Sequence, residues 1–181
     1  DSTDEQLTIA RREARTSALL QALADTSPDV IFAKDHDGRY LLFNREAVRV
    51  MGVTQDEVVG RTDAELFPPQ VAAQFLDNDH LAQALDRPEV FEEQVETADG
   101  RRTFQTVRGT LRLGDAERGT FGVSRDITEM VATRQRLQDG KRRYRMMFEL
   151  NPMPMAVVDI QSQRFLAVND AAMVHYGFER E

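Results

Sequence analysis

Residues 27–53 read SPDVIFAKDHDGRYLLFNREAVRVMGV, and residues 151–178 read NPMPMAVVDIQSQRFLAVNDAAMVHYGF. Both segments contain, in the same order, a proline, an apolar run, an aspartate, a polar turn, a second apolar run, an asparagine and a glycine. The second copy has one extra residue, which falls in the polar turn, where insertions are tolerated. The chain therefore contains one folding unit twice, and the rest of the sequence is interpreted from this repeat.

The first copy has the pattern of a β-hairpin followed by a helix. VIFAK (30–34) and RYLLF (39–43) are typical of short strands, and the Asp-Gly pair between them favours a hairpin turn. Asn44 stands at the N-cap position of a helix, and Gly52 stands where a left-handed residue would end it. Each copy is therefore predicted to open an α+β domain.

Composition narrows the class of protein. The 181 residues are 41% hydrophobic and 30% charged, which is typical of a globular chain. The formal net charge of −8 argues against nucleic-acid binding and against direct contact with an anionic membrane, because both need basic patches. No apolar run approaches the roughly 20 residues of a membrane span. The absence of cysteine excludes disulfides and thiolate metal sites, three scattered histidines predict no metal site, and the expected location is the cytoplasm.

The segments around the first hairpin predict one complete domain. Residues 1–24 are predicted to form an N-terminal helix with a narrow seam of small side chains, which docks on its own domain or pairs with a second chain. Capping boxes at Thr54 and Thr62 predict two short helices, and a longer helix follows from Pro69 to about residue 86. Three alternating segments then predict an antiparallel meander of strands: 89–98, 101–113 and 118–127.

The order of these elements is similar to a known family. DHDGRYLLFN (35–44), VGRTDAELFP (59–68) and GVSRDITE (122–129) resemble motifs of the PAS family of sensor domains. The resemblance implies a PAS fold: a five-stranded antiparallel sheet with short helices and one longer helix on one face, flanked by N- and C-terminal helices. It covers the first domain, 25–128, almost completely, and only the opening of a second domain, 151–181.

The resemblance also implies a place in signalling. PAS domains precede output modules such as histidine kinases of bacterial two-component systems or diguanylate cyclases, so a downstream output domain of the same protein is the expected partner. The sequence contains no kinase phospho-acceptor motif, GGDEF-like segment or P-loop, and we expect no enzyme activity within this chain. The whole protein is expected to be cytoplasmic, or to be anchored in a membrane with this part in the cytoplasm.

Residues 127–150 are predicted to form a linker helix that carries the signal between the two copies. Asp126 can cap this helix, and the residues at the predicted seam repeat at intervals of three and four. One interpretation is an amphipathic helix that packs on its own sheet. The other is a parallel helix pair in a homodimer, whose marginal seam could adopt two registers. The seam contains Ile127, Met130, Arg134, Leu137, Lys141, Tyr144 and Phe148.

In the PAS family the ligand lies between the sheet and the long helix. The resemblance therefore places the candidate pocket between the predicted helix that begins at Pro69 and the three predicted strands that follow it. The expected lining combines apolar side chains with Gln105 and His80 as polar anchors. Lys34 and Asp79 could form an inward salt bridge. The alternative for each apolar residue is a place in a filled core. The apolar candidates are Phe75, Leu76, Val95, Val107, Phe121 and Val123.

Three functions remain open from the sequence. The first is a dimeric sensor of a small molecule, and the second is a ligand-free PAS module for dimerisation and spacing. The third is a haem-based gas sensor, which is disfavoured because alignment of the long helix places the family's haem-binding histidine near Phe75 rather than at His80. Cofactors attached to or reacting with a cysteine, as in flavin-binding light sensors and photoactive yellow protein, are excluded because the chain has none.

Overall fold

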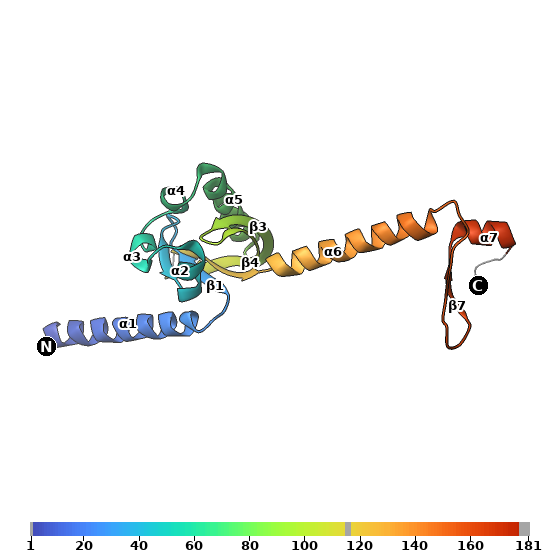
Figure 1. Cartoon of the computed structure of the whole chain (residues 1–181). Coiled ribbons are helices and arrows are strands. Elements are labelled where there is room, and N and C mark those ends of the chain that lie inside the picture. The colour runs from blue at the N-terminus through green and yellow to red at the C-terminus, as the bar shows by residue number, and fades with distance from the viewer. Residues whose placement is uncertain (1, 115–116, 178–181) are drawn as a thin grey trace. The chain divides into compact units, whose positions relative to one another are not determined.

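The computed structural model describes residues 2–114 and 117–177 (Figure 1). Asp1, the middle of the predicted loop 114–117 and residues 178–181 of the second copy lie outside the described residues. The chain divides after Thr128 into two compact units. Among the described residues, no helix is both long and apolar enough to cross a bilayer.

The first unit has the predicted order of elements. Its five strands form one antiparallel sheet in the order β2-β1-β5-β4-β3, which confirms the predicted fold class. The helices are α1 (Ser2–Asp25), α2 (Arg45–Met51), α3 (Gln55–Val58), α4 (Asp63–Leu66) and α5 (Pro69–Leu85). The strands are β1 (Val30–Lys34), β2 (Tyr40–Phe43), β3 (Glu89–Thr97), β4 (Gly100–Arg112) and β5 (Arg118–Asp126).

Local hydrogen bonds explain why the hairpin and short helices form where the sequence predicts them. In the turn between β1 and β2, Asp35 Oδ1 accepts from the backbone N–H groups of Asp37 and Arg39, and Gly38 has φ of +76°. Asn44 caps α2 by accepting from the N–H of Ala47. Both predicted capping boxes are present, at Thr54 and Thr62.

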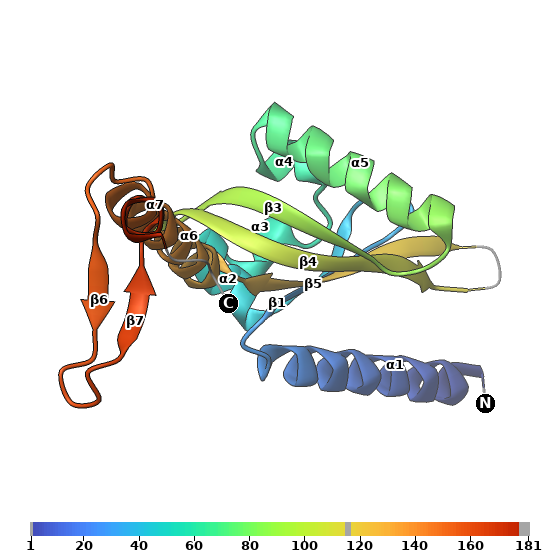
Figure 2. The same cartoon turned by 90° about the vertical axis from the view of Figure 1, so that its right-hand side faces the viewer.

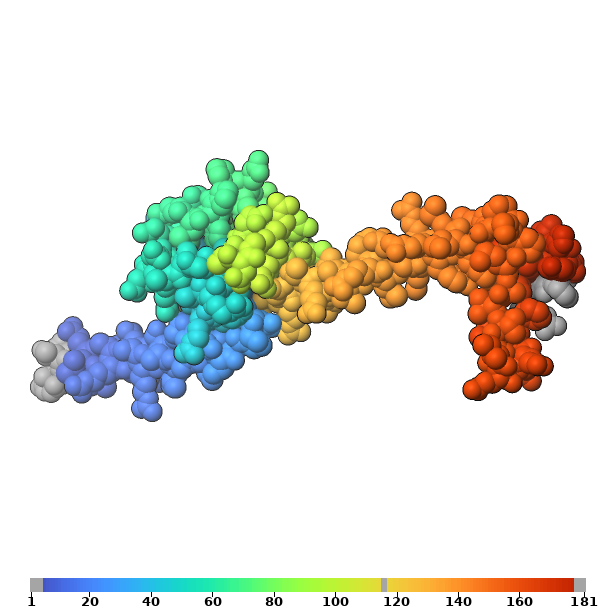
Figure 3. Space-filling view, in the orientation of Figure 1, coloured from blue at the N-terminus to red at the C-terminus, as the bar shows by residue number. Residues whose placement is uncertain are grey.

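The sheet has two unlike faces. Figure 2 shows α4 and α5 on one side of the sheet and α1 on the other. We call the side that faces α2 and α5 the inner face and the side toward α1 the outer face. The core lies on the inner face, in two adjacent clusters built around Phe32, Tyr40 and Phe43 and around Phe75, Val95 and Phe104. Most of α1 stays uncovered on the surface in Figure 3.

The second unit contains only the opening elements of a PAS domain among the described residues. The predicted linker helix is α6 (Thr128–Tyr144), followed by a π-helical turn η1 (Arg145–Glu149). The predicted linker segment 127–150 is therefore helical from Thr128 to Glu149, but its last turn widens from an α-helix into a π-helix, in which Phe148 is buried. The hairpin and helix of the second copy follow as β6 (Ala156–Val158), β7 (Phe165–Val168) and α7 (Asp170–Tyr176).

Candidate functional site

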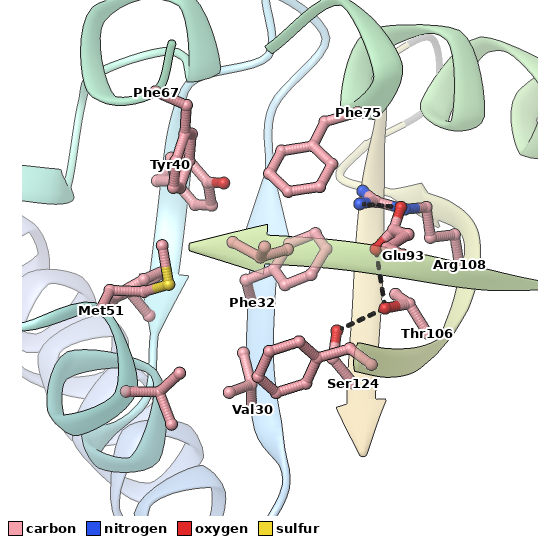
Figure 4. A pocket seen from close by; sticks show the side chains of 14 residues that line it. Val30, Phe32, Tyr40, Met51, Phe67, Phe75, Glu93, Thr106, Arg108 and Ser124 are labelled. Atoms are coloured by element: carbon pink, nitrogen blue, oxygen red, sulfur yellow. Dashed lines mark hydrogen bonds and ion pairs between the residues drawn. The ribbon is translucent and has the colours of Figure 1, made fainter. Parts of the chain in front are cut away.

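A cavity of about 50 Å³ lies between the inner face of the sheet, α2 and α5 (Figure 4). Aromatic and aliphatic side chains form most of its wall, and a short polar wall stands at one side. Residues of α2, α5 and all five strands contribute to the lining, so the cavity depends on how these two helices pack on the sheet. Its lining consists of Val30, Phe32, Tyr40, Phe43, Val50, Met51, Phe67, Phe75, Glu93, Val95, Phe104, Thr106, Arg108 and Ser124.

The polar wall is a chain of hydrogen bonds across three strands (Figure 4). The Thr106 hydroxyl lies 2.8 Å from Glu93 Oε2 and 2.8 Å from the Ser124 hydroxyl. Thr106 and Ser124 are directly paired residues of β4 and β5. Thr106 has a single hydroxyl proton, so if it donates to Glu93, Ser124 must donate to Thr106. The lone pairs of Ser124 then remain available to a guest.

Behind this wall lies a buried ionic network. Arg108 bonds Asp79 Oδ1 at 2.6 Å and Glu93 Oε1 at 2.8 Å, and Lys34 bonds Asp79 Oδ2 at 2.9 Å. Lys34 also pairs with Asp63, which accepts from the Tyr40 hydroxyl at 2.7 Å. The network therefore connects α4 and α5 to the sheet.

Opposite charges within the network stabilise each other's ionised forms. Burial opposes the charge of Arg108, but the carboxylates of Asp79 and Glu93 outweigh it and raise the pKa of this guanidinium above its usual value. Burial and the neighbouring charge of Asp63 raise the pKa of the Tyr40 phenol well above its usual value. Arg108 thus stays cationic and Tyr40 stays neutral, and each is paired within the protein.

The structure brings some of the predicted site residues together. Phe75 and Val95 line the cavity, and the predicted ion pair of Lys34 and Asp79 is present. Reasoning from sequence missed the other charged members of the buried network, Asp63, Glu93 and Arg108. The position of Arg108 could have revealed the network. It lies two residues after Thr106 and four after Phe104, and residues at these intervals share one face of a strand.

Four predicted lining residues on β4 and β5 lie on the outer face instead. Gln105 is exposed, whereas Val107, Phe121 and Val123 are half-buried there, and none of the four lines the cavity. The prediction assumed that apolar residues mark the inner face. In this sheet the inner face carries paired charges, and the polar residues Thr106, Arg108 and Ser124 point inward to the cavity.

Two predicted residues of α5 also point elsewhere. The inward side of α5 is formed by Ala72, Phe75, Asp79 and Ala82, at intervals of three and four. Leu76 and His80 each follow an inward residue by one position, which turns them away from the sheet. Leu76 is 48% exposed, and His80 lies in a shallow surface hollow with His36 and Arg118. Neither lines the cavity, so both assignments were wrong.

The start of α6 is fastened to the sheet. Asp126 Oδ1 accepts from the N–H of Thr128 at 2.9 Å, and Asp126 Oδ2 pairs with Arg102 at 2.6 Å. The Thr128 hydroxyl accepts from the N–H of Thr103, whose carbonyl accepts from Ile127. Partial burial opposes the charge of Asp126, but the bonds from Thr128 and Arg102 hold its pKa below the usual range.

Beyond its start, the predicted seam of α6 is open. Met130, Leu137 and Tyr144 are 57%, 60% and 47% exposed, and α6 buries none of its residues. Ile127 and Phe148, at the two ends of the seam, are buried in the first and second units respectively. The ring of Phe148 stacks on Tyr144 with centroids 5.2 Å apart.

Comparison with known proteins identifies the family. A family model described as a PAS fold matches residues 24–132, which is more than half of the chain. A second model, described as a PAS domain, matches residues 142–181. The chain belongs to the PAS family of sensor domains, as the sequence motifs and the five-stranded sheet predicted.

Two of the relatives are sensor proteins much longer than this chain. The Aerobic respiration control sensor protein ArcB of Escherichia coli (strain K12) is 28% identical over 130 residues, covering 70% of this chain and 16% of ArcB. The Virulence sensor protein BvgS of Bordetella pertussis is 31% identical over 128 residues, covering 67% of this chain and 10% of BvgS. The solved PAS domain of that BvgS has a TM-score of 0.54 at 26% identity, covering 71% of this chain and 98% of the domain.

Proposed function

We propose that this chain is the sensory input part of a longer signalling protein whose output domain, such as a histidine kinase, lies outside it. The support is that ArcB and BvgS are sensor proteins and that the chain spans only 16% and 10% of their lengths. The Methanogenesis regulatory histidine kinase FilI of Methanothrix harundinacea is also similar, at 30% identity over 14% of its length. An ATP-dependent output domain would place this part of the protein in the cytoplasm.

The first unit is proposed to bind a small neutral molecule in its cavity. Glu93 and Arg108 are the charged residues of the lining, and both are already paired within the protein. A charged guest would therefore be buried without a counter-ion, which is costly. An apolar body would contact the aromatic rings, and one polar edge could bond to Ser124. Ligand pockets usually measure about 300–1,000 Å³, so a larger guest requires movement of flexible side chains such as Met51.

The observation that carries this proposal is the continuity of the polar wall with the start of α6. Ser124, which forms one end of the wall, is separated from Asp126 by a single residue of β5. A guest that donates to a free lone pair of Ser124 adds a partner at this end of the wall, and the resulting movement of β5 acts on the bonds of Asp126 to Arg102 and Thr128. Signalling then continues through 127–150, where two copies of the chain pair along the open seam of a homodimer.

A thermal-shift screen tests the ligand proposal. We expect neutral compounds such as phenol or indole to raise the melting temperature, and we expect the charged analogues benzoate and benzylamine to have no effect. Val95→Phe should fill the cavity and abolish the shift. Val90→Phe is the matched control, because Val90 lies on the same strand but is 60% exposed, whereas Val95 is 7% exposed. A shift that survives Val95→Phe would contradict binding in this cavity.

A ligand-free module for dimerisation and spacing is the second candidate. The small volume of the cavity and the internal pairing of its charged residues favour it. Native mass spectrometry without any bound metabolite, together with a flat thermal-shift screen, would establish this function instead. The structure disfavours a haem-based gas sensor, because the residue of α5 that faces the cavity is Phe75 and not a histidine. A Soret band in the absorption spectrum of the purified protein would support haem binding after all.

A further inference from the structure

The two copies of the repeat hold their asparagines in the same way. In the first unit, Asn44 Oδ1 accepts from the N–H of Ile31 at 2.9 Å and of Ala47 at 3.0 Å. Its Nδ2 donates to the carbonyls of Ala24 at 2.9 Å and Asp29 at 2.9 Å. The side chain is fully buried, and these four bonds use both of its amide protons and two acceptor positions.

Asn169 repeats the arrangement in the second unit. Its Oδ1 accepts from the N–H of Met155 at 2.8 Å and of Ala172 at 2.9 Å. Its Nδ2 donates to the carbonyl of Phe148 at 2.9 Å, and further to Met153 and Asn151. It is fully buried as well. The same kinds of partner therefore recur in two copies of different sequence: the N–H of the third residue of the next helix, the N–H of a residue in or directly before the first strand, and the carbonyl of a preceding helix.

Each asparagine also bonds to a carbonyl at the end of the helix that precedes its domain, in addition to capping the helix that follows. Ala24 lies in the last turn of α1, and Phe148 lies in the π-turn η1 that follows α6. Carbonyls at the end of a helix lack i+4 partners within it. The carbonyl of Ala24 accepts from the N–H of Ser27 at 3.2 Å and that of Phe148 from the N–H of Asn151 at 3.4 Å, and the asparagine amide adds a shorter bond of 2.9 Å to each. In each copy, one side chain joins the end of the incoming helix to the first strand and to the next helix. In the first unit, that strand and helix carry Val30, Val50 and Met51 of the cavity wall.

We propose that Asn44 and Asn169 are positioning residues that couple each incoming helix to its own domain. A movement of the end of α1 then acts on the cavity walls through Asn44. A movement that leaves the first domain at Asp126 then reaches the second domain at Asn169. The two PAS units are thereby connected in series through α6. This coupling does not require a ligand, so it holds for a sensor and for a ligand-free spacer alike.

Hydrogen exchange on the whole chain tests the role of Asn44 through N44D. This variant keeps an oxygen that accepts from Ile31 and Ala47 but loses both N–H donors. We expect roughly three- to tenfold faster exchange of the amides at residues 24–27, which matches the loss of about one hydrogen bond. The amides of Ile31 and Ala47 should stay protected. In N44A all four bonds are lost, so protection should fall at both places.

A pH profile separates positioning from general loosening of the fold. At low pH the carboxyl of N44D becomes protonated and regains one O–H donor, so protection of residues 24–27 should recover, after correction for intrinsic exchange. The wild-type chain should show no such change. N169D should behave in the same way at residues 148–151 and leave the first unit unaffected.

N44S covers the case in which N44D does not fold. Serine introduces no buried charge and is a good N-cap, so Ala47 should stay protected while residues 24–27 are released. Equal loss of protection at Ala47 and at residues 24–27 in N44S would show that Asn44 only stabilises the domain. Unchanged exchange at residues 24–27 would show that Asn44 does not hold α1. Either result overturns the proposal.

Discussion

Arg108 is the residue on which the buried network depends most. It is the shared partner of Asp79 and Glu93, and both carboxylates are buried. Arg108→Leu leaves two buried carboxylates without this partner, so we expect the free energy of unfolding to fall by about 3–5 kcal/mol. Urea denaturation measures the change.

Arg112→Leu is the matched control for Arg108→Leu. Arg112 lies on the same strand, but its side chain is 72% exposed and its nearest carboxylate, that of Asp86, is 4.0 Å away. We expect a change within about 0.5 kcal/mol for this surface substitution. Similar losses in the two variants would show that the network contributes no more than a surface charge does.

The phenol of Tyr40 predicts a loss of stability in alkaline solution. Burial, followed by the charge of Asp63, raises its pKa above the usual value, so the unfolded state releases the proton first. The stabilisation is complete below about pH 10, the ordinary pKa of tyrosine, and decreases as the pH rises above it. Tyr40→Phe lacks this dependence. The difference in unfolding free energy between wild type and Tyr40→Phe should therefore shrink above pH 10 and stay constant between pH 7 and 9.

At the residue scale, the sequence could predict the ion pair of Lys34 and Asp79 but not the face on which its partners lie. Both faces of β4 and β5 are at least partly covered, so neither strand shows a clean alternation of buried apolar and exposed polar residues. Gly122 illustrates a further constraint that composition cannot reveal. A Cβ there would lie 2.2 Å from the Phe32 ring, so the strand needs glycine to let this ring pack on the inner face.

At the element scale, boundaries were predictable wherever a local hydrogen bond defines them. The hairpin turn, the capped starts of α2, α3 and α4, and the glycine that ends α2 all follow from side chains within a few residues. The π-turn after Tyr144 was not predictable. It accompanies burial of Phe148 beside the hairpin of the second copy, whose Asn169 lies 21 residues further along the chain.

The open seam of α6 predicts an effect of charge on dimerisation. Leu137 is 60% exposed within one chain, and in the proposed homodimer it would face its counterpart. Leu137→Asp should lower the dimer fraction in analytical ultracentrifugation because it places two like charges at the seam. Ala132→Asp is the matched control, because it adds the same charge on the opposite side of α6 and should leave the distribution unchanged.

At the scale of the whole molecule, the two units differ in how completely they bury their apolar residues. The first unit covers its sheet with α2 and α5, whereas the hairpin and α7 of the second leave large side chains such as Ile160, Phe165 and Val174 mostly exposed. Two strands alone are marginal in water, since a stable sheet needs more strands or a covering helix. The described part of the second unit therefore depends on the burial of Phe148 and on the bonds of Asn169.

This difference predicts two levels of protection within one chain. In hydrogen exchange at neutral pH, amides of β6 and β7 should exchange at least about a hundredfold faster than those of β4 and β5, because local opening needs far less free energy where few apolar contacts are lost. The strands of the first unit serve as the internal control. Dilution extends the test. If a second chain covers the β6–β7 hairpin, its protection should fall as the protein is diluted below the dimer dissociation constant, and that of β4 should not. Protection of β6 and β7 equal to that of β4 at every concentration would contradict the interpretation, because it would require a complete core within the second unit of each single chain.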